Sequence, residues 1–558
     1  MRQALIVTAA IPAAVIFFVL ATLPPRPRTV TASDPEIARR TVAGAYHVHT
    51  LRSDGSGDRA AVAAAAARAG LRFVIVTDHG DATRQPEAPA YIGGVLCLDG
   101  VEVSTSGGHY VALGLKASPY PLGGEAAAVI EDVARLGGFG IAAHPDSARP
   151  ELAWGAWQAP FDGIEWINAD SEWRNETRAR LARVLLAYPF RPAAALASIL
   201  DRPVNTIERW DALTRTRPVL AIAGDDAHGG VGRSAEYRGT TTRPFWTPGI
   251  PSYEASFRTF STNVVLPRPL TGDAAADAAA LLDAVRRGAV FTAVNALATP
   301  AVLDVRATRG STTVTMGETL TPGPVTIVAS ASGPPGARMV LLHDGAEVAA
   351  ASGGALRAEV AEASGAYRIE VHVPGAPGSP PVPWLFGNPV YFLPPPSAPV
   401  VPAMAEAVPL PADISWHVEK DRGSTASIVP GQSEVDFFYK LRGPGRGSQY
   451  AAAVADLQGR TLSGGAIALT VTAVRPARLS LQLRYRRDGG ARWGRSFYVD
   501  ATPREVRIPL ASLLPADRQS GPAPPLARAT SLILVADLTN ALPGAANTIR
   551  ISNAGLVP

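Results

Sequence analysis

The sequence predicts a multidomain chain in which an α/β barrel is preceded by a membrane-spanning segment and followed by two all-β domains. At 558 residues, 47% of them hydrophobic, the chain is too long for one core and apolar enough to fill several. Residues 45–297 alternate short β-like runs with alanine-rich helical stretches, the pattern of successive β/α units. From residue 298 on, apolar and polar residues alternate with period two between glycine and proline turns, which is typical of antiparallel sandwiches.

The N-terminus carries a long apolar stretch. Residues 4–23 contain no charge and are long enough to cross the hydrocarbon core of a bilayer. A cleaved signal peptide is the alternative, but no small-x-small cleavage site closes the stretch. We therefore expect residues 1–30 to form an uncleaved anchor and residues 31–44 a linker. The arginines after the stretch favour a cytoplasmic body, whereas a single N-terminal apolar segment usually directs export, and we expect an extracytoplasmic body.

Charge and cysteine content argue against a nucleic-acid-binding surface and exclude a disulfide within the chain. The formal net charge of +4 comes almost entirely from arginines that are scattered along the chain. No stretch therefore resembles a nucleic-acid-binding surface, and no nucleic-acid partner is expected. Cys97 is the only cysteine, so no disulfide can form within the chain, and its apolar surroundings indicate a core residue.

Six of the nine histidines lie between positions 47 and 228, almost all where a β-like run ends. In a β/α barrel those strand ends meet at one face, where the loops build the active site. The motif Y-H-V-H-T places His47 and His49 two residues apart, so on a regular strand both side chains point the same way. The motif G-D-D-A-H supplies Asp226 and His228 at the far end of the same domain, and Glu102 lies between the two pairs.

Such a set of side chains indicates a metal site. Imidazole and carboxylate ligands together suit zinc, manganese or iron, and the supply exceeds what one tetrahedral ion uses. We therefore expect two to three divalent ions. Any one of these histidines alone is more commonly a hydrogen-bonded structural residue, but the paired spacings make a coincidental set improbable.

Four motifs in order, H-V-H-T with a downstream S-D-G, then T-D-H, A-H-P and G-D-D-A-H, together with G-V-E-V-S, resemble the PHP family (polymerase and histidinol phosphatase). The resemblance covers roughly residues 45–295. It implies a distorted seven-stranded β/α barrel with a trinuclear metal site that hydrolyses phosphate mono- or diesters. Carried over by position, the implied metal ligands are His47, His49, Asp54, His79, Glu102, His109, His144, Asp226 and His228.

The resemblance also implies roles for three residues in catalysis. A hydroxide held between two ions would attack phosphorus, with Glu102 as the bridging carboxylate. Asp226 or His228 would relay a proton to the leaving group. The family often has a histidine at the position of Asp54, so that carboxylate either ligates directly or supports a ligand. Asp225 adjoins Asp226, and the D-x-H spacing favours Asp226.

Substrate recognition is less determined by the sequence. Arg52, Arg84 and Arg233 are candidates for clamping a phosphate through paired hydrogen bonds, and Asn168 is a candidate for lining the pocket with Trp166. A core role for Trp166 is an equal alternative. Residues 172–217 are interpreted as a helical insertion over the site.

The downstream domains raise a second class of function. Residues 298–395, which close with P-W-L-F-G-N-P-V-Y-F, resemble an immunoglobulin-like sandwich, and the proline-rich residues 396–412 form a linker. Residues 413–558 resemble the jelly-roll modules attached to carbohydrate-active enzymes, which implies a glycan partner, with a structural spacer as the alternative. The rival functions are accordingly a surface-anchored glycan-binding protein with an inactive barrel, or a metal-dependent amide or ester hydrolase.

Overall fold

The computed structural model describes residues 20–31, 34–230, 249–395, 406–411, 413–431, 434–457, 463–485, 490–516 and 525–558. These form two compact units. The barrel unit comprises Met1–Gly80, Pro86–Leu115 and Gly137–Pro396, and the C-terminal unit comprises Asp81–Gln85, Lys116–Leu136 and Ser397–Pro558. The predicted boundaries at residues 30, 44, 297, 395 and 412 stay predictions.

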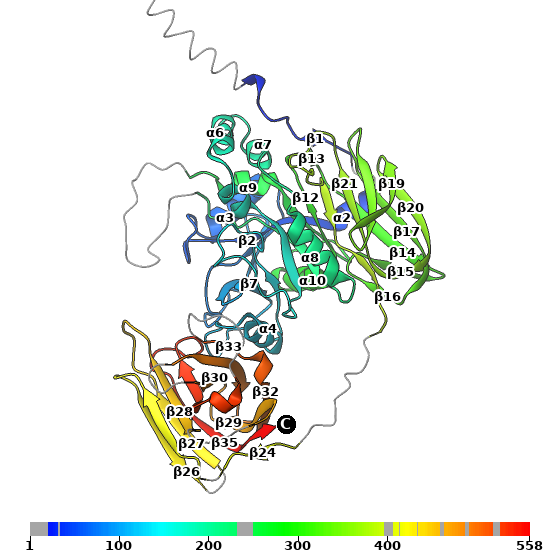
Figure 1. The fold of residues 1–558 in the computed structure, drawn as a ribbon. Coiled ribbons are helices and arrows are strands. Elements are labelled where there is room, and N and C mark those ends of the chain that lie inside the picture. Colours follow the sequence, from blue (N-terminus) through cyan, green and yellow to red (C-terminus); the bar gives the residue numbers. More distant parts are fainter. Residues whose placement is uncertain are drawn as a thin grey trace, which may run out of the picture. The chain divides into compact units, whose positions relative to one another are not determined.

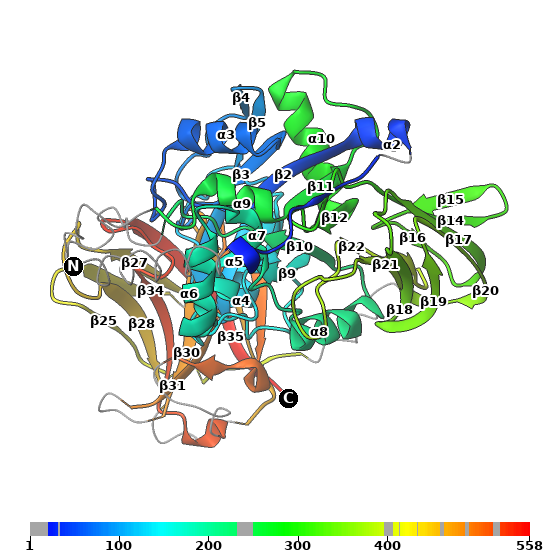
Figure 2. The ribbon, with the colours of Figure 1, turned by 90° about the horizontal axis from the view of Figure 1, so that it is seen from above.

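A closed ring of strands forms the centre of the barrel unit (Figures 1 and 2). Its strands are β2 (Thr41–Val48), β3 (Phe73–Val76), β6 (Val101–Thr105), β7 (Gly108–Leu113), β8 (Phe139–Ala142), β9 (Gly163–Asn168) and β10 (Leu220–Gly224). Isolated bridges close the ring, from Val48 to Ala227 and from His79 to Glu102. Strand β7 runs antiparallel to both of its neighbours. Tyr46, Phe73, Val111 and Ile141 are among the buried side chains of its core.

Further strands and helices surround the ring. The strands are β4 (Ala90–Ile92), β5 (Val95–Asp99), β11 (Ser261–Val265) and β12 (Val290–Ala293). The helices are α2 (Pro35–Arg40), α3 (Arg59–Arg68), α5 (Ala169–Arg174), α6 (Arg178–Ala187), α7 (Pro192–Ala197), α8 (Val204–Thr214), α9 (Tyr253–Thr259) and α10 (Ala274–Arg286). Helix α3 begins at Asp58, whose carboxylate accepts the N–H of Ala61, and ends before Gly70, whose φ of +83° suits the turn.

A β-sandwich in the same unit shares a sheet with the ring. Its strands are β14 (Leu303–Arg309), β15 (Thr312–Thr315), β16 (Thr319–Leu320), β17 (Gly323–Ala331), β18 (Arg338–His343), β19 (Ala346–Ser352), β20 (Ala355–Ala363), β21 (Gly365–His372), β22 (Leu385–Gly387) and β23 (Val390–Phe392). Strand β22 pairs with β12, which makes the sheet continuous. Trp166 stacks on Phe386 with ring centroids 4.1 Å apart, so Trp166 is a core residue. The short β1 (Arg28–Thr29) pairs with β13 (Ala298–Thr299).

The C-terminal unit is a second β-sandwich with one helix, α4 (Ala126–Arg135). One sheet holds β24 (Val408–Pro409), β26 (Thr425–Pro430), β27 (Glu434–Lys440), β29 (Ala466–Ala473), β32 (Arg504–Pro509) and β35 (Ala546–Val557). The other holds β25 (Trp416–Lys420), β28 (Tyr450–Asp456), β30 (Ala477–Arg484), β31 (Arg492–Val499), β33 (Leu514–Pro515) and β34 (Ser531–Asp537). Alternate residues such as Leu479, Leu481 and Leu483 fill the core between them.

The predicted fold class is wrong in two respects. Strands dominate the described residues, with nine α-helices against thirty-five strands, because hairpins replace several helical crossovers and both sandwiches are all-β. In addition, no helix of the described part is long and apolar enough to cross a membrane. The expectation of an anchor rested on the apolar residues 4–23, and residues 4–19 of this stretch lie outside the described residues. The expected membrane-anchored location is therefore corrected along with the anchor.

Candidate metal centre

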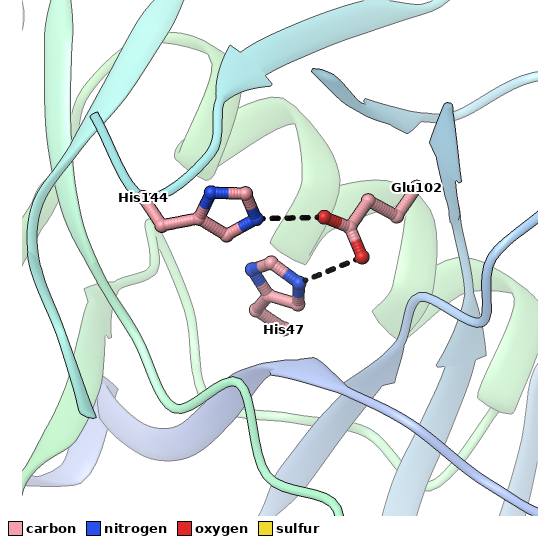
Figure 3. Close-up of side chains that lie close together, drawn as sticks. All are labelled: His47, Glu102 and His144. Atoms are coloured by element: carbon pink, nitrogen blue, oxygen red, sulfur yellow. Dashed lines mark hydrogen bonds and ion pairs between the residues drawn. The ribbon is translucent and has the colours of Figure 1, made fainter. Parts of the chain in front are cut away.

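The predicted ligands converge on the carboxylate of Glu102, which is buried at the start of β6. Figure 3 shows the rings of His47 and His144 pointing toward its two oxygens, one ring to each. Nε2 of His47 lies 3.2 Å from Oε2 of Glu102, and Nε2 of His144 lies 2.9 Å from Oε1. Nδ1 of His79 lies 3.1 Å from Oε2, and Nδ1 of His109 lies 2.6 Å from Oε1. With His49, whose Nε2 lies 3.3 Å from Oε2, five imidazoles thus contact one carboxylate.

Asp226 forms a second point of convergence beside the first. Its Oδ1 lies 3.2 Å from Nε2 of His49 and 3.5 Å from Nε2 of His47. His49 also lies 3.3 Å from Glu102, so the two histidines of the H-x-H motif connect both carboxylates. All four of these side chains are buried.

Asp54 and His228 complete the cluster at its solvent side. Nε2 of His228 lies 3.3 Å from Oδ2 of Asp54, and Nδ1 of His49 lies 3.4 Å from Oδ1. The rings of His49 and His228 stack with centroids 4.4 Å apart. The Asp54 side chain is 34% exposed, which makes it the most open of the predicted ligands.

Four overlapping triads in this cluster have their ligand atoms within 4.8 Å of one another. They are His47–Glu102–His144, His47–His49–Asp226, His49–Asp54–His228 and His49–His79–Glu102. His109 is outside the triads but contacts Glu102. The structure therefore brings all nine predicted ligands together.

The backbone is unusual at three of these residues. His47, His144 and Asp226 have φ values of +64°, +29° and +44°, a region that costs a non-glycine residue about 1–3 kcal/mol. The pairing of β2 with β3 shifts register between Tyr46 and Val48, so His47 lies on an irregularity and His49 follows the strand. The two histidines therefore converge through local distortion, and not through the regular strand alternation that we expected.

Burial and mutual attraction shift the pKa values of the cluster. Burial alone would raise the pKa of Glu102 and Asp226, but the surrounding imidazoles, His47 foremost, hold both well below their usual range. Burial likewise opposes protonation of His49, yet Asp226 and Glu102 raise its pKa to about 10. The same carboxylates raise the pKa of His144. The buried carboxylates thus favour the protonated, positively charged form of the imidazoles between them.

Several buried atoms of the cluster have no hydrogen-bond partner. They are Nε2 of His47, Nε2 of His49, Oε2 of Glu102 and Oδ1 of Asp54. These atoms lie near one another but are poorly aligned for hydrogen bonds among themselves. Burying such groups unsatisfied is costly, whereas imidazole nitrogen and carboxylate oxygen are ordinary ligands of divalent ions. The donor set therefore fits divalent metal ions.

Two supporting carboxylates were not among the predicted site residues. Glu165, buried in β9, accepts from Nδ1 of His47 at 2.5 Å and from the backbone N–H of His144 at 2.7 Å. Its bond to His47 leaves Nε2 of that ring facing the cluster, as in many metal sites. Asp78 accepts three bonds of 2.7 Å from Thr50 and Ser53 and so fixes the loop after His49. An acidic residue inside an otherwise apolar strand was the available signal for Glu165.

The predicted substrate residues lie elsewhere. Arg52 pairs with Asp99 and with Glu87, each at 2.8 Å. Asn168 caps α5 by accepting the N–H of Ser171 and donates to Glu165 at 2.8 Å, so it supports the cluster from behind. Arg84 is exposed and belongs to the C-terminal unit. Arg233 lies outside the described residues.

Asp225 takes a different position from its neighbour Asp226. It is buried, and its Oδ2 lies 3.3 Å from the backbone N–H of Tyr46. Burial raises its pKa well above the usual range, since the N–H of Tyr46 and the charge of His47 offset only part of that cost. This placement agrees with Asp226 being the carboxylate that contacts the histidines.

Comparisons with solved structures give only distant likenesses. A two-domain protein from Bacteroides vulgatus, described as containing a predicted PHP-like metal-dependent phosphoesterase, is 13% identical, with a TM-score of 0.30 over 65% of this chain and 99% of that chain. The family 11 carbohydrate-binding module of a Clostridium thermocellum cellulase is 16% identical, with a TM-score of 0.22 over 28% of this chain and 96% of that chain. No family model and no curated protein matches the chain.

Proposed function

We propose that this chain is a metal-dependent phosphoesterase whose cluster binds two to three divalent ions. The observation that carries the proposal is the convergence of six imidazoles on Glu102, Asp226 and Asp54, with buried nitrogen and oxygen atoms that lack hydrogen-bond partners. The order of the sequence motifs supports the same class.

The chemistry of a phosphoester fits such a centre. When bound, divalent ions lower the pKa of a water molecule and neutralise the oxygens of an anionic ester. Glu102 is the carboxylate that would hold ions together with these histidines, since His47 approaches one of its oxygens and His109 the other. Glu165 and Asn168 keep His47 in the orientation that this requires.

His228 is the best-placed residue for moving a proton to the leaving group. Its Nδ1–H donates to the backbone carbonyl of Asp226 at 2.8 Å, which directs Nε2 toward Asp54, 3.3 Å away, as the atom through which a proton would pass. The side chain is 20% exposed and lines the cavity described below. Asp226 is enclosed by His47 and His49, so we assign it to ion binding and His228 to proton transfer.

Glycan binding by the C-terminal unit stays a prediction with less support. Arg478 in β30 is buried against α4, where it donates to Asp132 at 2.5 and 2.9 Å and to Glu131 at 2.9 Å. Glu125, just before α4, accepts the N–H of Ser496 at 2.8 Å. This part of the sheet face is therefore covered by the chain itself.

The test is hydrolysis by the purified full chain of p-nitrophenyl phosphate, its bis-ester, p-nitrophenyl acetate and a p-nitroanilide. Each is measured before chelation, after chelation, and after manganese, zinc or iron is returned. We expect chelator-sensitive release from a phosphate ester that metal restores. Metal-dependent turnover of the acetate or anilide alone would assign the centre to another bond, and absence of turnover with every metal would overturn the proposal.

A further inference from the structure

A cavity of about 200 Å³ adjoins the candidate metal centre. Asp54, Asp226 and His228 form its side toward the cluster. Residues of α5, α7 and α9, with the segment after α7, form the remaining walls. A molecule in this cavity would therefore contact the solvent-facing ligands directly.

The walls away from the cluster differ in chemistry. Trp173, Leu196, Ile199 and Leu200 give the cavity an apolar side. Among the described residues that line the cavity, Arg174 is the only lysine or arginine. Arg52 and Arg84, two of the arginines singled out from the sequence, do not line it.

Arg174 lines the same cavity as Asp54, Asp226 and His228. It forms an ion pair with Asp170, one turn earlier in α5, and its side chain is 35% exposed. Burial lowers its pKa, but Asp170, and then Asp226 and Asp54, raise it above the ordinary value. Arg174 thus interacts electrostatically with two of the predicted metal ligands.

Helix α5 is tied to the metal centre. Asn168 caps the helix and donates to Glu165, and Glu165 accepts from His47. Helix α5 therefore connects Arg174 to the hydrogen-bonded residues that orient the centre. Glu172 also lines the cavity, and burial raises its pKa to about 8, so at neutral pH it adds little negative charge near a phosphate.

We propose that Arg174 binds the phosphate group of a phosphomonoester whose single, compact, largely apolar alcohol lies against Trp173, Leu196, Ile199 and Leu200. This inference rests on the proposed phosphoesterase function and names its substrate class. Guanidinium groups bind phosphate through paired, charge-assisted hydrogen bonds. A monoester has three nonbridging oxygens and a diester has two, so a monoester offers Arg174 one more acceptor. A diester lacks that third oxygen and would need room for a second alcohol.

The reaction is ordinary hydrolysis. The oxygen of water forms a bond to phosphorus, and the bond from phosphorus to the alcohol oxygen breaks. The alcohol oxygen takes a proton, which His228 is placed to deliver, and inorganic phosphate is released. Phosphate itself should therefore bind at Arg174 as product.

The test compares Arg174→Met and Arg174→Lys with Arg178→Met in the manganese-loaded full chain. Arg178 is exposed at the start of α6 and does not line the cavity, so it is a matched control. Binding of inorganic phosphate is measured by calorimetry, and KM and kcat are measured with p-nitrophenyl phosphate. We expect Arg174→Met to raise the phosphate dissociation constant and KM by about 10- to 100-fold, the loss of a hydrogen-bonded charge. Arg174→Lys should retain part of the affinity and Arg178→Met all of it, with equal metal content throughout.

Substrate choice gives a second measurement. The wild type should prefer benzyl phosphate to glucose 6-phosphate by at least about 10-fold in kcat/KM, because both leave as alkyl alcohols and only the benzyl group fits the apolar wall. It should prefer p-nitrophenyl phosphate to its bis-ester, which has the same leaving group, by a similar factor. Unchanged phosphate affinity in Arg174→Met, or preference for the sugar phosphate or the diester, would overturn the inference and leave the phosphoesterase function standing. A wild type without bound metal or turnover would overturn both.

Discussion

The barrel unit contains two buried clusters of charged side chains, and they are built differently. Around Glu370 in β21, Arg202 donates to both carboxylate oxygens at 2.7 and 2.8 Å. Arg368 donates to Glu370 at 3.2 Å and also pairs with Asp211 of α8. His372 adds a contact of 3.2 Å. Two guanidinium groups thus balance two carboxylates.

The candidate metal centre has no such balance. Within the described residues, no lysine or arginine contacts Glu102 or Asp226, and only imidazoles surround them. Buried nitrogen and oxygen atoms remain without hydrogen-bond partners there. A buried cluster in which arginine and carboxylate charges cancel stabilises the fold. A cluster whose carboxylates are paired only with imidazoles, which can release their protons, is suited to binding a metal ion.

The largest expected effect follows from altering the unbalanced cluster. Asp226→Asn removes a charged ligand between His47 and His49 and should lower kcat/KM for a phosphate ester by about 10³- to 10⁴-fold. The melting temperature of the metal-free protein should fall as well, because His47, His49 and His228 lose the carboxylate whose charge they stabilise. Asp283→Asn, on the exposed face of α10, is the matched control and should keep full activity.

Altering the balanced cluster should affect stability alone. Glu370→Ala leaves Arg202 and Arg368 buried without their common partner, and should lower the free energy of unfolding by about 3–5 kcal/mol. Metal content per folded chain should not change. Denaturant unfolding measures the first quantity and elemental analysis the second. The exposed Glu359→Ala should cost less than about 0.5 kcal/mol. A Glu370→Ala variant as stable as Glu359→Ala would show that the pairing contributes nothing.

A smaller effect is expected one layer behind the metal ligands. Glu165→Gln keeps the shape of the side chain. The carboxylate accepts hydrogen bonds from three donors, whereas the amide would place an NH₂ group, itself a donor, against one of them. His47 then loses its fixed orientation, and metal affinity should fall about 10- to 100-fold. Competition with a metal-binding dye measures this. A metal affinity equal to that of the wild type would show that Glu165 does not support the metal centre.

Glu172 lies between these two cases. Its carboxyl group is buried, and it accepts a hydrogen bond from the backbone N–H of Asp201 at 2.6 Å. Burial raises its pKa from 4.5 to about 8. Between those pH values the folded protein holds a proton that the unfolded chain has released, so this group makes stability fall as pH rises. The contribution is at most about 1.4 kcal/mol per pH unit.

Glu172→Gln should remove this slope between about pH 5 and pH 8, as measured by urea unfolding at several pH values. The control is Glu359→Gln, whose side chain is 78% exposed and whose partner Arg357 is 63% exposed, and it should leave the slope unchanged. A Glu172→Gln variant with the wild-type slope would show that Glu172 is ionised in the folded protein at neutral pH.

The cluster could be predicted from the sequence because its ligands occur in short motifs at strand ends. H-x-H and D-x-H spacing identify His47, His49, Asp226 and His228 without knowledge of the fold. The positive φ of His47 could not be predicted, since it depends on packing against Glu165, 118 positions away. Arg174 could not be distinguished from other arginines, because only the course of α5 places it at the cavity.

The fold was predictable at the level of alternating patterns and not at the level of long-range packing. Period-two alternation identifies the strands of both sandwiches. The grouping of α4 with the C-terminal unit depends on Arg478 and Asp132, which are 346 positions apart and form no local pattern. The twenty apolar residues at the N-terminus were weighed by length and hydropathy alone, and that is where the predicted fold class and location were wrong.

Metal binding by the purified full chain tests the central claim most directly. Manganese and zinc are titrated into metal-free wild type and into Glu102→Gln, with stoichiometry from calorimetry and elemental mass spectrometry. Glu102 contacts imidazoles on both oxygens, so we expect two to three ions per wild-type chain and at least one fewer in the variant. A wild type that binds no divalent ion, or a variant that binds as many ions with equal affinity, would contradict the account.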